Sequence, residues 1–248
     1  MTPESLSAET APPPLGEAGR ITGVFLDPKK AFADIAARPR FLVPLTLLIV
    51  SYLAFMYCFT THVGWERSMR QAFESNARVQ QMDPQARENA LQMQLKFAPI
   101  GAYVVGPIVV VVIALATAGV LLLMIKMMGA SLTFKQMFGI SSYAMLPGLV
   151  SSILTIIVIF IKNPEDFNLQ NPLAFNLAAF LEPPPNSSKV LYSLANSIDL
   201  FSFWTILLLA VGISVAARKF PFSKALIAVL VPWVLLVLIK SGWAGLFG

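Results

Sequence analysis

Residues 137–161, MFGISSYAMLPGLVSSILTIIVIFI, decide the fold class of this chain. The stretch has no charged residue over 25 positions, and a helix needs about 20 apolar residues to cross the roughly 30 Å hydrocarbon core of a bilayer. Its first half differs from a helix that faces only lipid, because residues 139–148, GISSYAMLPG, include two serines, a tyrosine, a proline and two glycines. We therefore predict a membrane-spanning helix whose first half packs against other helices.

The composition of the whole chain supports the same class. Hydrophobic residues make up 56% of the sequence and charged residues 12%, with a mean hydropathy of +0.71, which is far from the balance of a soluble domain. We predict an all-α membrane protein, a bundle of five transmembrane helices with an amphipathic N-terminal helix and a helical extracytosolic loop. The four other predicted spans are 41–60, 98–125, 198–217 and 222–241.

Basic residues near the ends of the spans predict the orientation of the chain. They concentrate before the first span and in the short second and fourth connections, so we predict a cytosolic amino terminus and a carboxyl terminus outside. Residues 1–19 are polar and proline-rich, which predicts a disordered tail ahead of a membrane domain of residues 20–248. The basic residues that carry the orientation are Arg20, Lys29, Lys30, Arg38, Arg40, Lys126, Lys135, Arg218, Lys219 and Lys224.

A short amphipathic helix is predicted just before the first span. Asp27 followed by Pro28 is typical of an N-cap and a first helical residue, and Phe32, Ile35 and Ala36 then recur at helical spacing. We expect this helix to lie on the cytosolic surface, either as a topology signal with a connector or as a contact to anionic lipid headgroups.

Two exterior loops contain further apolar segments. Residues 65–97 are predicted to form two helices broken at Asp83 and Pro84. The second helix carries an apolar stripe, which we expect to pack on neighbouring spans or to lie in the membrane interface, with partner recognition as the alternative. In the third loop, NPLAFNLAAFL (171–181) is too short to span and too apolar for a solvated loop, so it is predicted to be interfacial or re-entrant. The stripe consists of Ala86, Ala90, Met93 and Phe97.

Enzyme classes are disfavoured by counting the residues that they require. The chain has one histidine, His62, and one cysteine, Cys58, so it lacks both a two-histidine metal motif and a cysteine cluster. Asp199 is the only acidic residue in any predicted span, which excludes paired intramembrane carboxylates. We predict no catalytic residue, no metal and no cofactor, although a Ser–Lys pair is not excluded by this count.

Asp199 is the ionisable residue that most needs an explanation, because an acid inside a span is a functional candidate by default. It lies two residues after Ser197, a possible helix cap, and an acid in the first turn is stabilised by free backbone N–H groups and the helix dipole. A transport or relay role is the alternative. Matching depth in adjacent spans also predicts an interhelical ion pair between Asp199 and Lys240.

Small and polar residues in the spans fit close packing between helices, since lipid gives helices little hydrophobic drive to associate. Gly212 and Ala216 have small-xxx-small spacing, and Gly148 permits close approach. Ser141 and Ser142, with Ser151 and Ser152, are predicted to bond across helices or to carbonyls freed near Pro147.

Four stretches, in this order, carry a resemblance to a known family: FLDPKKAFADIAARPRFLVPL (25–45), FKQMFGISSYAMLPGLV (134–150), SLANSIDLFSFWTILLLAVGISV (193–215) and SKALIAVLVPWVLLVLI (223–239). They resemble the Yip family of Ypt-interacting proteins, five-span membrane proteins with a cytosolic amino terminus. The resemblance covers nearly everything from about residue 20 onward. SYAMLP looks like the aromatic-to-proline signature of the family, which implies that Tyr143 and Pro147 are helix-packing features.

The chain departs from the eukaryotic members of that family, which are associated with Rab-type GTPases and vesicle traffic. It has a short proline-rich tail where they carry a longer cytosolic region, and it has no DLYGP-like match. Rab binding is therefore not carried over, and the chain looks more like a prokaryotic member, which implies a bacterial inner (plasma) membrane.

Two functions follow as hypotheses. The first is a non-enzymatic scaffold or adaptor that organises membrane proteins or bilayer structure, with lipids, other membrane proteins or further copies of the chain as partners and no nucleic acid. The second is a lipid- or solute-handling protein with a path lined by Ser141, Tyr143, Ser151, Thr155 and Asp199. The candidate functional or packing residues are Ser141, Ser142, Tyr143, Pro147, Gly148, Asp199, Trp204, Gly212 and Lys240.

Overall fold

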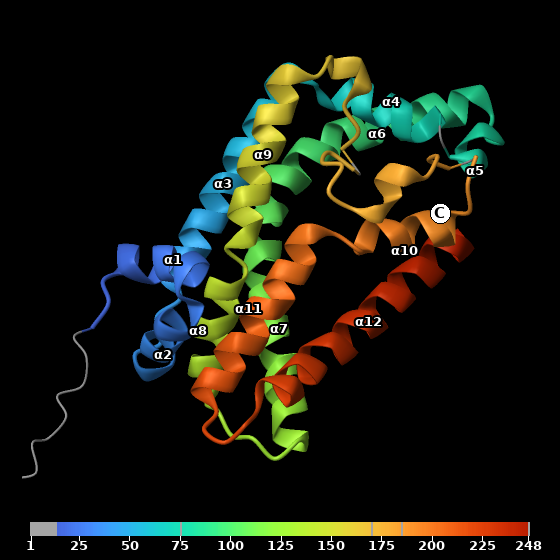
Figure 1. The fold of residues 1–248 in the computed structure, drawn as a ribbon. Helices are drawn as coiled ribbons and strands as arrows, with labels where there is room; N and C mark the ends of the chain where they lie inside the picture. The colour runs from blue at the N-terminus through green and yellow to red at the C-terminus, as the bar shows by residue number, and fades with distance from the viewer. Residues whose placement is uncertain (1–13, 75, 170, 185, 248) are drawn as a thin grey trace, which may run out of the picture.

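The computed structural model describes residues 14–74, 76–169, 171–184 and 186–247, and the regular secondary structure of these residues is helical apart from one isolated β-bridge (Figure 1). The predicted all-α class is therefore confirmed. The elements are α1 (Glu17–Leu26), α2 (Pro28–Ala37), α3 (Leu42–His62), α4 (Trp65–Glu74), α5 (Ala77–Gln80), α6 (Pro84–Ile100), the π-helical turn η1 (Gly101–Val105), α7 (Gly106–Met127), α8 (Phe134–Ala144), α9 (Pro147–Ile161), the 3₁₀ turns η2 (Pro164–Asp166) and η3 (Leu177–Phe180), α10 (Lys189–Ser197), α11 (Leu200–Ala216) and α12 (Phe222–Phe247).

Four helices of the described residues are long and apolar enough to cross a membrane: Leu42–His62, Pro84–Met127, Phe134–Ile161 and Phe222–Leu246. The fifth predicted span, 198–217, is α11, an apolar helix of only 17 residues. Its length of about 26 Å, at 1.5 Å per residue, is less than the roughly 30 Å hydrocarbon core. The predicted count of five is thus replaced by four full-length helices and one shorter apolar helix in an integral membrane protein.

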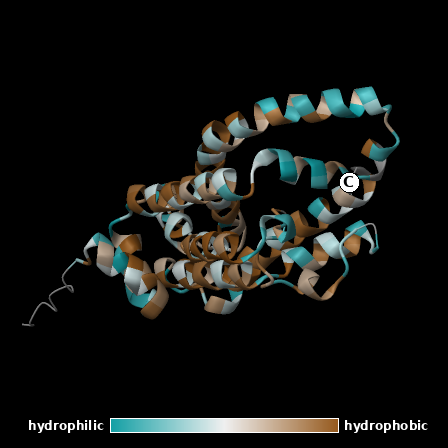
Figure 2. Cartoon of the chain, turned by 90° about the horizontal axis from the view of Figure 1, so that it is seen from above, coloured by the Kyte–Doolittle hydropathy of each residue, from teal (hydrophilic) through white to brown (hydrophobic). Residues whose placement is uncertain are grey.

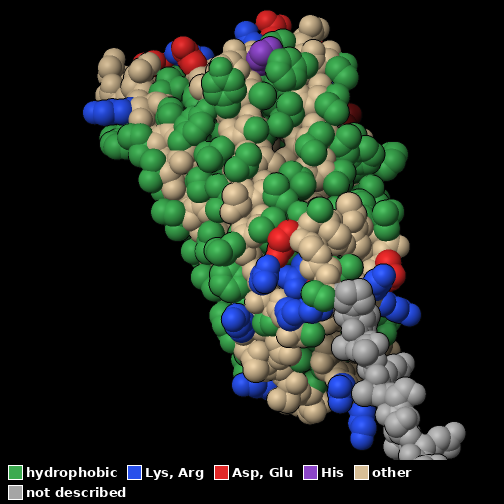
Figure 3. Space-filling view, turned by 90° about the vertical axis from the view of Figure 1, so that its left-hand side faces the viewer, with side chains coloured by type: hydrophobic (Ala, Val, Ile, Leu, Met, Phe, Trp, Pro, Cys, Tyr) green, Lys and Arg blue, Asp and Glu red, His purple; other side chains and the backbone are tan. Residues whose placement is uncertain are grey.

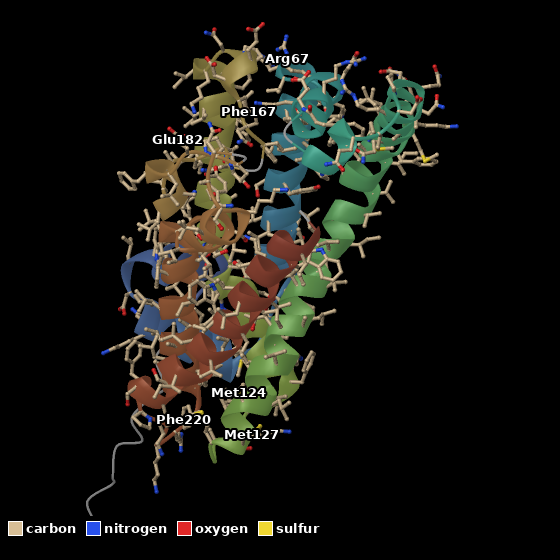
Figure 4. The ribbon with its side chains drawn as sticks, turned by 90° about the vertical axis from the view of Figure 1, so that its right-hand side faces the viewer. Arg67, Met124, Met127, Phe167, Glu182 and Phe220 are labelled. Carbon is tan, nitrogen blue, oxygen red and sulfur yellow. The ribbon has the colours of Figure 1, made fainter. Side chains whose placement is uncertain are left out.

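The bundle has two distinct ends. We call the end that carries α1, α2 and the connections 128–133 and 217–221 the basal end, and the end that carries α4 and α6 the distal end (Figure 1). Figure 4 shows Phe220 near the basal end of α7, where Met124 and Met127 lie, whereas Arg67 and Phe167 lie at the opposite end. The basic residues of the short connections therefore gather with those of α1 and α2.

The outer surface between the two ends is apolar. Figure 3 shows a broad band of hydrophobic side chains, with charged side chains gathered toward both ends, and Figure 2 shows that the packed helices are largely hydrophobic. Only 22% of the apolar window of the Pro84–Met127 helix and 17% of that of Phe222–Leu246 are buried inside the chain. Most of the surface of α7 and α12 is therefore available to lipid or to another membrane protein.

The polar first half of the third span ends in a break between α8 and α9. α8 ends at Ala144, and Pro147 is the first residue of α9, where its missing N–H costs no helical hydrogen bond. The two residues between the helices form short-range bonds, from Leu146 N to Tyr143 O (3.2 Å) and from Gly148 N to Met145 O (2.9 Å). The proline thus produces a kinked span, Phe134–Ile161, rather than a straight one.

The N-terminal helices form a hairpin that packs on the bundle. Asp27 caps α2 by accepting a hydrogen bond from Lys30 N (3.3 Å), as predicted. Phe32 and Ile35 are fully buried in the main core, because α2 packs against α8 and α11. The predicted amphipathic helix is therefore formed and protein covers its apolar face, whereas its contact to anionic lipid headgroups stays a prediction.

The predicted disordered tail also needs correction. Residues 1–13 lie outside the described residues, but α1 already begins at Glu17, inside the predicted tail of residues 1–19. The helix is stabilised by tertiary contacts of Glu17 and Arg20 that the local composition does not reveal.

Helices α4 to α6 form a hairpin at the distal end. It has the predicted break but leaves Met93 and Phe97 of its predicted apolar stripe exposed. Asp83 caps α6 through Gln85 N (2.9 Å), and Pro84 is the first helical residue. Leu91 is buried, and α4 packs on α6. Met93 and Phe97 of the predicted stripe are 65% and 57% exposed, so the structure excludes packing on neighbouring spans for these two residues.

Replacing Gly212 by alanine tests the docking of α2. A Cβ at this position would lie 2.5 Å from Ile140 Cγ2 and 3.0 Å from Phe32 Cδ1, so α2 or α8 must shift. We expect Gly212→Ala to lower the free energy of unfolding by about 1–3 kcal/mol, measured by thermal or SDS unfolding in detergent micelles. Gly119→Ala on α7 is the matched control, because its Cβ would meet nothing within 4 Å. Equal stability of the two variants would contradict the described packing.

Candidate functional site

Four charged or polar side chains form what we call the basal cluster: Glu17 and Arg20 on α1, Asp34 on α2 and Tyr143 on α8. Arg20 is only 2% exposed, and two of its nitrogens, Nε and Nη2, each lie 2.7 Å from Asp34 Oδ2. A buried guanidinium is stable only when its charge is paired and its donors are used. The pair therefore ties α1 to α2.

Asp34 receives hydrogen bonds from three sides. In addition to Arg20, its Oδ1 accepts from Leu15 N (3.2 Å) and from the Arg38 guanidinium one turn later on α2. Burial alone would raise the pKa of Asp34, but the bonds from Leu15, Arg20 and Arg38 outweigh it and hold this pKa below its usual value. Asp34 thus stays ionised, and its role is structural because both of its carboxylate oxygens already accept hydrogen bonds.

Tyr143 connects this ion pair to the membrane bundle. Its side chain is fully buried in the core, and its hydroxyl donates a hydrogen bond to the Glu17 carboxylate. Arg20 Nη1 lies 3.5 Å from the other oxygen of Glu17, without a hydrogen bond of its own. Burial lowers the pKa of Arg20, but its hydrogen bonds to Asp34 and the negative charge of Asp34 raise it, so the net direction is upward and the guanidinium stays charged.

Two more predicted residues meet the same N-terminal hairpin. Trp204 on α11 contacts Phe25 of α1 edge to face, with ring centroids 5.4 Å apart and an interplanar angle of 71°. Gly212, two turns further along α11, lies against Phe32 of α2. Tyr143, Trp204 and Gly212 therefore converge on one structural unit, the docked α1–α2 hairpin.

Ser141 and Ser142, two other predicted residues of the third span, form no hydrogen bond to another helix among the described residues. Ser142 Oγ donates to Phe138 O in its own helix (2.7 Å), and Ser141 Oγ is buried without a partner among the described residues. The predicted bonds from these two serines to other helices are therefore not formed. A Cβ at Gly148 would meet Leu48 at 3.7 Å, an ordinary contact, so no close approach requires glycine there.

The sequence does not identify the basal cluster as a site, because Tyr143 lies more than 100 residues after its other members. The sequence indicates only a topology signal for Arg20 and places Glu17 inside the predicted tail. One local signal was present, since Asp34 and Arg38 lie four residues apart on a predicted helix.

A second group of polar side chains lies in an open recess of about 200 Å³ beside the start of α11. We call it the polar recess; its polar lining residues are Ser151, Asn171, Asn176, Asn196 and Asp199. The structure thus brings together Ser151 and Asp199 of the predicted path, but places Tyr143 in the basal cluster instead. Thr155 Oγ1 donates to the carbonyl of Ser151 on its own helix (2.9 Å).

The predicted ion pair between Asp199 and Lys240 is wrong. Asp199 is itself the N-cap of α11, and its Oδ1 accepts from Phe201 N and Ser202 N, both at 2.9 Å. Lys240 Nζ donates instead to Ser197 Oγ (3.1 Å), and Ser197 is the last residue of α10 rather than the cap of α11. The prediction rests on the similar depth of the two residues in adjacent spans, but hydrogen bonds to nearer groups decide their partners.

Among the described residues, no group of three or more His, Cys, Asp or Glu side chains lies close enough to hold a metal ion.

Comparison with known proteins gives one match. The Yip1 domain model matches residues 22–243, which runs from the middle of α1 to near the end of α12. The matched region includes Asp34, Tyr143 and Asp199, whereas Glu17 and Arg20 precede it. No curated protein and no solved structure is matched.

Breaking the buried ion pair tests the role of the basal cluster. Arg20→Met leaves Asp34 buried without its main counter-charge, so we expect the free energy of unfolding to fall by about 3–5 kcal/mol and α1 to become sensitive to protease. The double variant Arg20→Met with Asp34→Leu should regain most of this loss, because neither charge remains. SDS unfolding and limited proteolysis measure both effects. Arg70→Met, which breaks only exposed ion pairs, those with Glu66 and Glu88, is the control and should behave as the parent protein. A single Arg20 variant as stable as this control would refute the role.

Proposed function

Because the chain belongs to the family of Yip1 domain proteins, we propose that it is a non-enzymatic membrane scaffold or adaptor that organises other membrane proteins or local bilayer structure. The observation that carries the proposal is the helix formed by α6, η1 and α7. It runs without interruption from Pro84 to Met127, 44 residues. At 1.5 Å per residue it is about 66 Å long, twice the roughly 30 Å hydrocarbon core, so half of it extends past the membrane.

The exposed surface of this long helix favours contact with a partner protein over packing within the chain. Its apolar window is 22% buried, and Met93 and Phe97 remain exposed on α6 next to the membrane. Exposed apolar side chains on the part of a helix that extends past the bilayer are stabilised where a second protein or the membrane interface covers them. We assign Met93 and Phe97 to the contact with a partner membrane protein.

The fixed N-terminal hairpin supports the same function at the other end. Its charged residues are used for docking, and Arg38 and Arg40 keep 43% and 70% of their side chains exposed. A rigid platform with exposed cations suits contact with anionic headgroups or with an acidic surface of another protein. The single histidine and single cysteine of the sequence support the non-enzymatic part of the proposal.

We place the basal end in the cytosol of a bacterial cell, with the protein in the inner membrane and the carboxyl terminus outside. The gathering of basic connections at the basal end supports this orientation. Rab-type GTPase binding forms no part of the proposal.

A second function, handling of lipids or small solutes, is favoured by the polar recess. Its carboxylate and amides lie beside α9 within a candidate membrane span, where polar groups are costly unless they serve a ligand or path.

Site-specific photocrosslinking in native membranes tests the scaffold proposal. A photoreactive residue in place of Phe97 should give discrete protein adducts, because Phe97 lies on the proposed contact face. The same residue in place of Gln92, which is exposed on another face of α6, is the matched control and should give far fewer. Adducts with lipid alone at Phe97, or equal protein adducts at both positions, would remove the support for an adaptor.

Single-cysteine labelling tests the orientation. In a Cys58→Ser background, a membrane-impermeant maleimide should label Glu165→Cys in intact cells and Lys29→Cys only after permeabilisation. Both parent residues are exposed at opposite ends of the bundle. The reverse labelling pattern would overturn the proposed orientation.

A further inference from the structure

The long helix that α6, η1 and α7 form carries one apolar face from the distal hairpin toward the membrane. Six residues of this face follow one another at alternating intervals of four and three positions. The alternation gives the period of about 3.5 residues that a coiled coil requires, in which positions a and d of each heptad form the contact between two helices. These residues are Ala86, Ala90, Met93, Phe97, Ile100 and Val104, and the last four are each more than half exposed.

The π-helical turn η1 keeps this face continuous past a proline. In an unbroken heptad the contact position after Val104 would fall on Pro107. η1 takes in one extra residue, because Gly106 N bonds to Gly101 O, five positions back rather than four. The face therefore shifts by one position and continues at three exposed residues, Ile108, Val112 and Leu115.

We call the six residues of the first part and these three the seam. It covers residues 86–115, or about four heptads, and an apolar heptad pattern of this length is typical of a coiled coil. At 1.5 Å per residue the seam is about 45 Å long, whereas the hydrocarbon core is roughly 30 Å thick. Lipid therefore covers only part of it, and about 15 Å at the α6 end extends past the core.

The chain itself packs on other faces of this helix. α4 packs on α6, where Leu91 is buried, and Ala114 and Ala118 of α7 are fully buried in the main core. At 100° per residue these positions lie on different sides of the helix from the seam. Figure 4 shows the helix, in green, along one edge of the molecule from the labelled Met127 to the distal end. The seam thus faces outward from the bundle.

We propose that the seam pairs with the seam of a second copy of this chain, as a parallel two-helix coiled coil that crosses the membrane surface. This inference rests on the proposed scaffold function, because it names the partner at the contact face of Met93 and Phe97. Two copies with the same orientation in one membrane hold this helix parallel and at the same height. Their heptads therefore meet in register, and a two-fold axis along the membrane normal brings each seam residue to its own counterpart.

The residues beside the seam are compatible with such self-pairing. With Met93 at position d and Phe97 at position a, Asn89 and Lys96 occupy position g. In a parallel pair each g residue faces position e of the next heptad in the second copy, which holds Gln94 or Gly101. Two amides thus meet in one pair and a lysine meets a glycine in the other.

A different membrane protein would need an apolar helix with the same period that extends equally far past the bilayer. A second copy meets all of these requirements by identity, and neither pair of flanking residues brings two like charges together. The seam is therefore better matched to itself than to a helix that only spans the membrane.

Disulfide crosslinking in native membranes tests the pairing in the full chain. In a Cys58→Ser background, Met93→Cys and Phe97→Cys each place a thiol opposite its counterpart, at a separation that a disulfide can bridge. We expect at least tenfold more disulfide-linked dimer for these variants than for Gln92→Cys. Gln92 is exposed on a neighbouring face of the same helix, so it is the matched control, and all three variants should fold because their parent residues are exposed.

A charge in the seam tests whether the pairing is stable rather than a product of collisions. Met93→Glu puts two carboxylates face to face in one layer of the coiled coil, so we expect the dissociation constant of the dimer to rise at least tenfold. The measurement is subunit counting by single-molecule photobleaching in vesicles of increasing lipid-to-protein ratio. Gln92→Glu adds the same charge outside the seam and should dimerise as the parent protein does.

The outcomes separate this inference from the scaffold function. Protein adducts at Phe97 whose masses exclude a second copy, with no disulfide-linked dimer, would overturn the pairing and leave the scaffold function in place. Lipid adducts alone would remove the support for both. Equal crosslinking of Gln92→Cys and Phe97→Cys, or parental dimerisation of Met93→Glu, would also overturn the seam as the contact.

Discussion

The ion pair between Arg20 and Asp34 holds α1 and α2 together as the hairpin that docks on the bundle. A guanidinium that is 2% exposed has lost nearly all its hydration, so its charge must be balanced by the carboxylate it touches. Once Asp34 is fixed by Arg20, α1 and α2 can bury Val24, Phe32 and Ile35 against α8 and α11. Tyr143 then extends the polar contact into the membrane bundle through Glu17.

This docking explains the polar residues in the first half of the third span. α8 is covered on several sides by α2, α7 and α11, so all residues from Met137 to Ala144 are buried. A helix in such surroundings carries small and hydroxyl side chains, because neighbouring backbones approach closely and Ser142 can bond to its own helix. Beyond the break at Pro147 one side of the helix is exposed, and its residues are mostly aliphatic apart from Ser151, Ser152 and Thr155.

The sequence was sufficient for features that depend on neighbouring residues and insufficient for contacts between distant ones. Apolar length identified the spans, and Asp27–Pro28 and Asp83–Pro84 identified two helix starts, because a cap is a local interaction. The basal cluster joins residues up to 126 positions apart, and no local pattern specifies such a pair. The pairing of Asp199 with Lys240 was wrong for a related reason. Similar depth in adjacent spans says how far along the membrane two residues lie, but the rotation of each helix and the fold of the intervening connection decide whether they touch.

The length of α11 links the two polar groups. Because the connection from α9 folds back along the bundle, α11 begins beside Ser151 rather than at the distal end, and it has only 17 residues. Its first turn therefore holds the Asp199 carboxylate at the polar recess, while Trp204 and Gly212 further along contact α1 and α2. A longer α11 would carry Asp199 out to the distal surface, where water would solvate the carboxylate. The shortness of this helix thus places an acidic side chain beside the middle of a candidate membrane span, where a charge is costly unless it is paired or solvated.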